Sequence, residues 1–117
     1  GVTQRLALLV CKVLAKYLIY TAEMIDAAEA LRIGLVEKVV PSEELMETAE
    51  KVANTIASKA PIAVAQAKIA IGEGMDMNLR SGCQLEVEAS TACFGSEDKF
   101  EGMSAFMEKR KAEWKNK

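Results

Sequence analysis

The stretch LALLVCKVLAKYLIY, residues 6–20, is apolar on nearly every side of any helix that it could form. Its apolar positions are Leu6, Ala7, Leu8, Leu9, Val10, Val13, Leu14, Leu18 and Ile19. A helix that is apolar all round is normally buried on all sides. The other segments of the chain are too short to surround it, so we expect it to need an outside partner. The chain also begins without a Met or a polar lead-in, and we interpret it as a fragment from the middle of a longer protein.

Charge and hydropathy argue against two classes of partner. The formal net charge of −2 gives no electrostatic case for nucleic acid or for an anionic membrane surface. Lys12 and Lys16 interrupt the apolar run, which stays below the ~18 residues that a membrane span needs. A signal peptide would have a basic start and a small-residue cleavage site, and neither is present. We therefore expect a cytoplasmic protein without nucleic-acid or membrane partners.

Cysteine and histidine usage narrows the possible chemistry. Cys11, Cys83 and Cys93 form no CxxC pair and are odd in number, which favours reduced, mostly buried thiols of a cytosolic protein. Histidine is absent, which excludes Ser-His-Asp and Cys-His arrangements and removes the commonest metal ligand. Chemistry in this chain must therefore depend on carboxylates, lysines, thiols or backbone amides.

Helix signals follow one another along the chain. Thr3 is predicted to cap one helix, or two abutting ones, that continue to about Tyr20. Asp26, with a glutamate three residues later, predicts a short helix that stops at Gly34. The β-branched segment LVEKVV, residues 35–40, predicts a brief extended stretch. The pattern is that of an all-α unit with a little extended chain.

The second half of the sequence predicts four further helices, starting at Ser42, Pro61, about Asn78 and Ser96. The helix after Pro61 should stop at Gly74, the next should reach Phe94, and the last is expected to continue to Trp114. Helical spacing predicts buried faces at Leu45, Ala49, Val52 and Ile56; at Ile62, Ala65, Ile69 and Gly72; and at Leu79, Cys83, Val87 and Cys93.

Four segments of the sequence follow the sequence pattern of one protein family. The opening GVTQRL is similar to the family's GGTQRL, and IYTAEMIDAAEALRIGLVEKVVP is similar to its LTG…I.A.EA…GLV..VVP pattern. APIAVAQAK follows, and FGSEDKFEGMSAFMEKRK resembles F.T.D..EGM.AF.EKRK. Order and spacing agree without a gap over the 117 residues. Together the four segments resemble the enoyl-CoA hydratase, or crotonase, family, including its bacterial short-chain 3-hydroxybutyryl-CoA dehydratases.

The resemblance implies a position within that fold. Residues 1–117 correspond to the helical C-terminal (trimerisation) region of the crotonase, or ClpP-like, fold, starting where the N-terminal spiral of strand–strand–helix units ends. In the family, two backbone N–H groups of the spiral form an oxyanion hole and two glutamates of the spiral move protons. The complete enzyme would reversibly hydrate a short 2-enoyl-CoA. We therefore expect no catalytic residue in this chain, and no activity from it alone.

Lys109 and Arg110 are the candidate binding residues. Lys109 matches a family lysine that reaches the phosphates of coenzyme A, in some members from a neighbouring subunit. From Lys99 onward the chain has six basic and three acidic residues, and Arg110 could add a guanidinium fork to the point charge of Lys109. The alternative is a solvated helix end whose cations favour the helix dipole. The resemblance implies acyl-CoA as substrate, a homo-oligomer (trimer or dimer of trimers), and no separate cofactor or metal.

The other candidate residues have structural interpretations. Glu86 and Glu88 would point about 200° apart on a helix, so we expect them to be solvated. Two other carboxylate pairs lie in the first turns of predicted helices, where we expect them to be solvated or to cap the helix: Glu43 and Glu44, and Glu97 and Asp98. Phe94 and Phe106 are predicted to pack in a core or between subunits. Ser90 stands where some members place an aromatic side chain against the CoA adenine, so that contact is in doubt.

Three residues replace glycines of the family pattern. They are Val2, Cys11 and Ala22. If these positions require positive φ, each substitution would cost about 1–2 kcal/mol. Cys11 lies in an apolar run and is expected to be an inert, buried thiol.

Two other functions remain open from the sequence. One is an autonomous, non-catalytic module that oligomerises or docks on a full-length relative. The other keeps the fold but changes the reaction to enoyl-CoA isomerisation or thioester hydrolysis, because family members differ mainly in residues upstream of this stretch.

Overall fold

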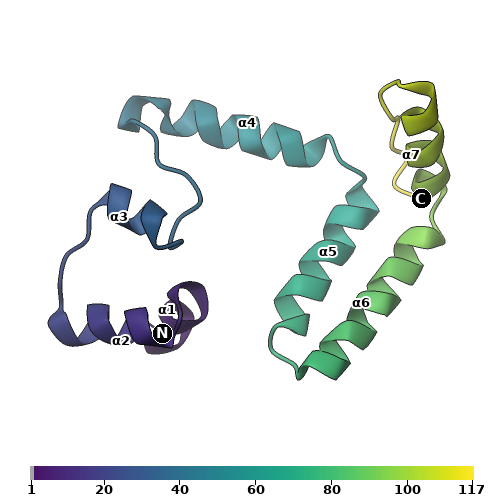
Figure 1. Ribbon diagram of the computed structural model, residues 1–117. Helices are drawn as coiled ribbons and strands as arrows, with labels where there is room; N and C mark the ends of the chain where they lie inside the picture. Colours follow the sequence, from purple (N-terminus) through teal and green to yellow (C-terminus); the bar gives the residue numbers. More distant parts are fainter. Residues whose placement is uncertain (1) are drawn as a thin grey trace. The chain divides into compact units, whose positions relative to one another are not determined.

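The computed structural model describes residues 2–117, whose regular elements are all helices, with no strand among them (Figure 1). The helices are α1 Val2–Val10, α2 Lys12–Thr21, α3 Ala27–Arg32, the 3₁₀ helix Ser42–Glu44, α4 Leu45–Ala57, α5 Pro61–Gly74, α6 Leu79–Phe94 and α7 Glu97–Glu108. The all-α prediction is confirmed, whereas residues 35–40 form a connection without strand pairing. None of the helices in the described part is long and apolar enough to cross a membrane. The chain divides into two compact units, Gly1–Thr48 and Ala49–Lys117.

In the first unit, the apolar stretch forms two helices that break at Cys11. Cys11 has φ 71° and ψ 160°, and α2 ends at Ala22 with φ 50°. Both positions therefore have the positive φ expected of glycine sites, whereas Val2 lies inside α1. Because α1 begins at Val2, the predicted cap at Thr3 is wrong.

The short third helix follows the prediction. The Asp26 carboxylate accepts a hydrogen bond from the Glu29 N–H at 2.7 Å and so caps α3. Gly34, with φ 74°, ends the helical turn in the left-handed region. The capping signal was sufficient here because donor and acceptor are three residues apart and need no tertiary support.

Most of the apolar surface of α1 and α2 is uncovered. Leu8 is 74% and Val13 is 78% exposed, and only Val10 and Ala15 are buried in these helices. Within the described residues of the first unit, this stretch has no element that covers its apolar surface, as expected. Cys11 is also exposed, so the prediction of a buried thiol is wrong.

The helix α4 starts later than predicted and exposes its apolar face. Ser42 lies in the 3₁₀ helix Ser42–Glu44 rather than capping α4, which begins at Leu45. The residues predicted to be buried are all exposed: Leu45, Ala49, Val52 and Ile56. Periodicity identified the apolar side of the helix correctly, but it does not say whether another element covers that side.

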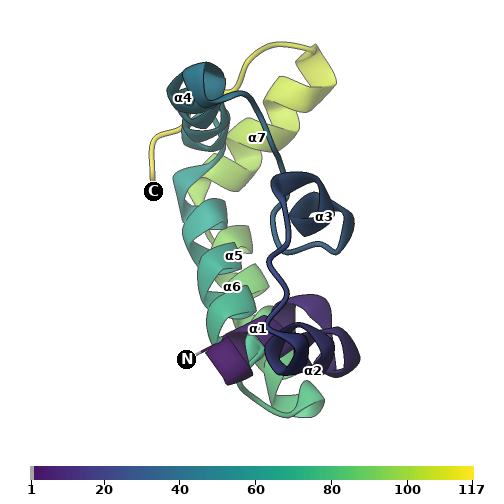
Figure 2. The ribbon, with the colours of Figure 1, turned by 90° about the vertical axis from the view of Figure 1, so that its left-hand side faces the viewer.

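In the second unit, α5 and α6 form an antiparallel hairpin (Figures 1 and 2). Pro61 is the first residue of α5, and the Asn78 side chain caps α6 by accepting from the Ser81 N–H at 3.0 Å. Both starts agree with the prediction. The helices approach closely where Gly74 meets Gly82, because a Cβ at Gly82 would lie 3.0 Å from the Gly74 carbonyl oxygen.

The contact faces of this hairpin differ from those predicted. The less exposed positions of α5 are Ile62, Gln66, Ala70 and Gly74, and those of α6 are Gly82, Leu85, Ala89 and Cys93. Leu79, Cys83 and Val87 are exposed, as are Ala65, Ile69 and Gly72. Of the predicted inward positions, Ile62 and Cys93 are on the less exposed sides and the other six are not. The hairpin packs around the close approach of Gly74 and Gly82, and helical spacing alone does not show which face of a helix lies against a neighbour.

Candidate functional site

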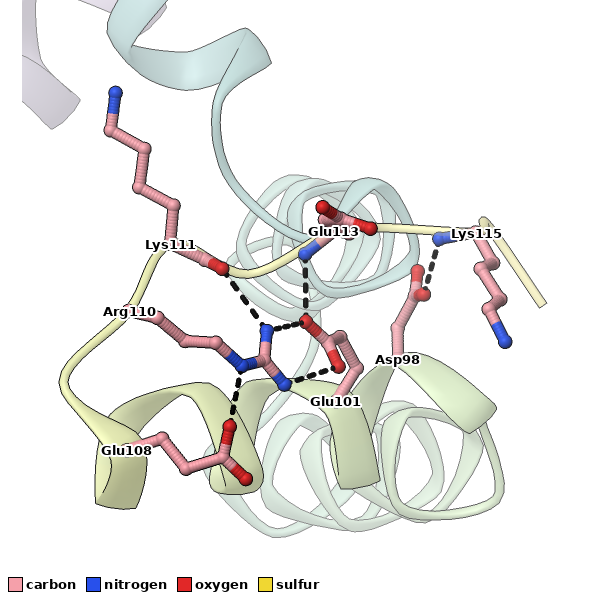
Figure 3. Close-up of polar contacts among 7 residues, drawn as sticks. All are labelled: Asp98, Glu101, Glu108, Arg110, Lys111, Glu113 and Lys115. Atoms are coloured by element: carbon pink, nitrogen blue, oxygen red, sulfur yellow. Dashed lines mark hydrogen bonds and ion pairs between the residues drawn. The ribbon is translucent and has the colours of Figure 1, made fainter.

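The C-terminal residues 110–117, here called the strap, fold back along α7 (Figure 3). Ser96 caps the start of α7 as predicted, accepting from the Lys99 N–H at 3.2 Å. The helix ends at Glu108 rather than near Trp114, because Lys109 takes the left-handed conformation with φ 54° and ψ 37°. The strap therefore leaves α7 at Lys109.

Arg110 joins the strap to α7. Its Nη1 and Nη2 donate to the two Glu101 carboxylate oxygens at 2.5 and 3.0 Å, and its Nε donates to Glu108 at 2.6 Å. Arg110 Nη1 also donates to the Lys111 carbonyl oxygen at 3.1 Å. Hydrogen bonds from Arg110, with one from the Glu113 N–H, lower the pKa of Glu101 to about 2. The same carboxylates raise the pKa of Arg110, so both groups are charged.

Asp98 fastens the far end of the strap. Its carboxylate accepts from the backbone N–H groups of Lys115 at 2.7 Å and Asn116 at 3.0 Å. Asp98 is only 2% exposed. The prediction of a solvated or helix-capping role for Asp98 is therefore wrong, because its partners lie 17 and 18 residues away. A separate hydrogen bond, from the Glu97 N–H to the main-chain oxygen of Lys117 at 2.7 Å, joins the end of the strap to the first residue of α7.

Trp114 packs the middle of the strap against two other segments. Its indole Nε1 donates to the Ser58 carbonyl oxygen at 2.8 Å, just after α4. Its ring lies over Gly102, where a Cβ would come within 3.2 Å of the ring. The contact between Trp114 and Gly102 was not predicted from the sequence. The glycine inside a helix was the available signal, since it marks a place where another group comes close.

The two predicted binding residues are neighbours with different surroundings. Lys109 is exposed, and its side chain forms no ion pair with residues 2–117. Arg110 instead has its guanidinium occupied by two carboxylates. A phosphate could therefore reach the Lys109 ammonium directly, whereas two-point binding by the Arg110 fork would require displacement of Glu101 or Glu108.

A shallow groove runs between α5 and α6. Its volume is about 520 Å³, and small residues such as Ala63, Ala67 and Ala70 form much of its lining. Glu86 and Ser90 lie on its α6 wall, and Glu86 is its only carboxylate. The groove therefore offers no pair of carboxylates for general acid–base chemistry.

A second groove, of about 390 Å³, lies where α5, α6 and α7 meet. Phe94 and Phe106 are on its lining and are 65% and 82% exposed, so neither packs in a core of the described chain. The Lys99 ammonium lies 4.7 Å from the centroid of Phe94 and 4.8 Å from that of Phe100. This is the spacing of a cation–π contact.

Sequence comparison places the whole chain among proteins of one family. The sequence model described as "Enoyl-CoA hydratase/isomerase" matches residues 1–117. The chain is 52% identical over 113 residues to a short-chain-enoyl-CoA hydratase of Clostridium acetobutylicum, covering 97% of this chain and 43% of that protein. It is 48% identical over 117 residues to a crotonyl-CoA hydratase of Syntrophomonas wolfei, covering 100% of this chain and 45% of that protein.

The structure is also similar to that of solved proteins. An enoyl-CoA hydratase from Bacillus anthracis superimposes with a TM-score of 0.94 at 45% identity, covering all of this chain and 45% of that one. The chain thus spans less than half the length of the relatives that it matches.

Proposed function

The chain belongs to the enoyl-CoA hydratase/isomerase family, and from this we propose that it acts as the C-terminal helical region of a short-chain enoyl-CoA hydratase. In that setting it would complete the acyl-CoA site, and the assembled enzyme would reversibly hydrate a short 2-enoyl-CoA. The observation that carries the proposal is the identity of 52% and 48% to two short-chain hydratases over nearly all of the chain.

We propose Lys109 as the group that binds a phosphate of coenzyme A. Its ammonium is exposed and is not neutralised by a carboxylate within residues 2–117. Lys109 also occupies a left-handed position at a helix end where glycine is the usual residue. A lysine there costs conformational energy, and backbone strain of this kind often accompanies a functional site.

The carboxylates of this chain are poor candidates for the proton transfers. Glu101 is held by Arg110, and Asp98 is held by the strap backbone. Among the described residues, Glu86 is the only carboxylate that lines the groove between α5 and α6, so it has no second carboxylate to work with there. We therefore propose that the acid–base residues belong to the part of the family fold that these residues do not span, and that the isolated chain does not hydrate crotonyl-CoA.

A hybrid enzyme tests the proposal. In the hybrid, this chain replaces the matching segment of the C. acetobutylicum relative, and hydration is followed by loss of the conjugated enoyl-thioester absorbance. We expect the hybrid to hydrate crotonyl-CoA. A folded hybrid that lacks activity, beside an active parent, would contradict the proposal. An assay with a 3-enoyl-CoA distinguishes isomerisation from hydration.

The role of Lys109 is tested in the same hybrid with two substrates. Lys109→Gln should raise KM for crotonyl-CoA about tenfold, the size of one charge-assisted contact. It should leave KM for crotonyl-pantetheine unchanged, because this thioester lacks the nucleotide and its phosphates. Lys68→Gln removes an exposed charge on α5 and is the matched control. An equal effect of Lys109→Gln on both substrates would exclude a phosphate contact.

We also propose, as a second function, that the chain takes part in a homo-oligomer, a trimer or a dimer of trimers. The supporting observation is exposed apolar surface on α1, α2 and α7, including Leu8, Val13 and Phe106. Exposed apolar surface of this extent is typical of interaction sites. Sedimentation of the hybrid should give an oligomer at micromolar concentration, and a stable monomer there would contradict this role.

A further inference from the structure

Arg110 was expected to bind phosphate, but its contacts suggest a different function. A guanidinium has five N–H donors in a fixed plane. Four Arg110 hydrogen bonds are already made, three to the carboxylates of Glu101 and Glu108 and one to the Lys111 carbonyl oxygen. A phosphate approaching this fork would find one unused Nη2 N–H beside two carboxylates, and no pair of free donors.

Glu101 lies at the centre of this arrangement. One of its oxygens accepts from both Arg110 Nη1 and the Glu113 N–H, and the other accepts from Arg110 Nη2 (Figure 3). Its side chain is 22% exposed, against 60% for Glu108. Glu101 therefore connects two points of the strap to the middle of α7, and Glu108 adds an outer contact.

Arg110, Glu101 and Glu108, here called the clamp, lie around the turn at Lys109. This residue lies between the last residue of α7 and Arg110, and its left-handed backbone is held by a hydrogen bond from Arg110 N–H to the Ala105 carbonyl oxygen at 3.0 Å. With both sides of the turn attached to α7, the backbone from which the Lys109 side chain leaves has little freedom. Ordering a charged group before binding removes part of the entropic cost of binding.

We propose that Arg110 is a positioning residue for Lys109: clamped by Glu101 and Glu108, it fixes the turn from which the Lys109 ammonium reaches a CoA phosphate, and does not bind the phosphate itself. This inference rests on the proposed function of Lys109. It assigns the two adjacent cations different roles, one as a ligand of substrate and one as part of the scaffold.

The hybrid enzyme distinguishes positioning from direct binding. If Arg110 positions Lys109, Arg110→Gln and Glu101→Gln should each raise KM for crotonyl-CoA by roughly three- to tenfold. Their combination should have no larger effect than either alone, since both break the same clamp. Hydrogen exchange at the Glu113 N–H should become faster in both variants. If Arg110 bound phosphate directly, Glu101→Gln would free its guanidinium and would lower KM or leave it unchanged, which would overturn the proposal.

Three further measurements complete the test. The increase in KM should be confined to crotonyl-CoA and absent with crotonyl-pantetheine, and kcat should be retained, which a general loss of stability would not produce. Arg110→Lys keeps the positive charge but loses the planar guanidinium that bonds both carboxylates, so it should raise KM for crotonyl-CoA as much as Arg110→Gln does. If Lys109→Gln has no effect on KM, the phosphate role of Lys109 is wrong. If Lys109→Gln raises KM but the clamp variants do not, only the positioning role is wrong.

Discussion

Replacing Gly82 by alanine should destabilise the α5–α6 hairpin, although alanine is the better helix former. A Cβ at this position would lie 3.0 Å from the Gly74 carbonyl oxygen, a few tenths of an ångström inside ordinary contact. The oxygen belongs to the backbone and cannot rotate away, so the two helices must separate. Gly72→Ala is the matched control, because Gly72 also lies within the hairpin and a Cβ there meets nothing within 4 Å.

The expected magnitudes follow from two opposing effects. Replacing glycine by alanine inside a helix stabilises the helix by about 0.5–1 kcal/mol. Steric overpacking between elements typically costs about 1–3 kcal/mol. Gly72→Ala should therefore raise the free energy of unfolding by about 0.5–1 kcal/mol. Gly82→Ala should lower it by about 1 kcal/mol, because the steric cost exceeds the gain in helix propensity. The difference between the two variants isolates the steric cost, because the helix-propensity gain is common to both.

Urea unfolding followed by far-ultraviolet circular dichroism measures both variants against the parent chain. The free energy of unfolding should change in opposite directions for the two substitutions, at unchanged dependence on urea concentration. Equal stabilisation by both would show that Gly74 and Gly82 do not approach closely, and would refute the packing described for this hairpin.

Two further predictions concern the strap and the strained turns. Because the folded pKa of Glu101, about 2, is lower than its ordinary value of 4.5, the stability from its contacts is present above pH 4.5 and is lost as the pH falls towards 2. The fluorescence of Trp114, the only tryptophan, should change over this interval, and a Glu101→Gln variant with the same titration would contradict the assignment. Cys11→Gly and Ala22→Gly should each raise the free energy of unfolding by about 1 kcal/mol, since both residues have positive φ. Cys83→Gly, in the regular helix α6, should lower it by about 1 kcal/mol in the same urea titration.

Local signals in the sequence predicted most helix starts. Asp26, Asn78 and Ser96 cap the helices expected of them, and Pro61 begins α5. These predictions succeeded because a cap needs only a side-chain oxygen and a backbone N–H a few residues away. The prediction failed at Ser42, where a 3₁₀ turn precedes the helix.

The faces of the helices could not be predicted in the same way. Leu79 and Val87 looked like core residues, but the hairpin packs through positions such as Gly82 and Ala89. Spacing identifies which residues share a side of a helix. The side that is covered depends on which other element lies against it, and small residues permit the closest approach.

By itself, the sequence determined the helical class and the family resemblance, both of which depend on residues close together in the chain. The structure then showed positive φ at Cys11 and Ala22, two of the three positions where the family pattern has glycine. Only the tertiary structure distinguished the surroundings of Lys109 and Arg110. The partner that occupies the guanidinium, Glu101, lies nine residues before it. The strap folds back along α7, and the contacts of Asp98 and Trp114 hold it there across 17 and 56 residues of chain. Interactions over such separations depend on the path of the backbone in space, and no local pattern of residue types encodes that path.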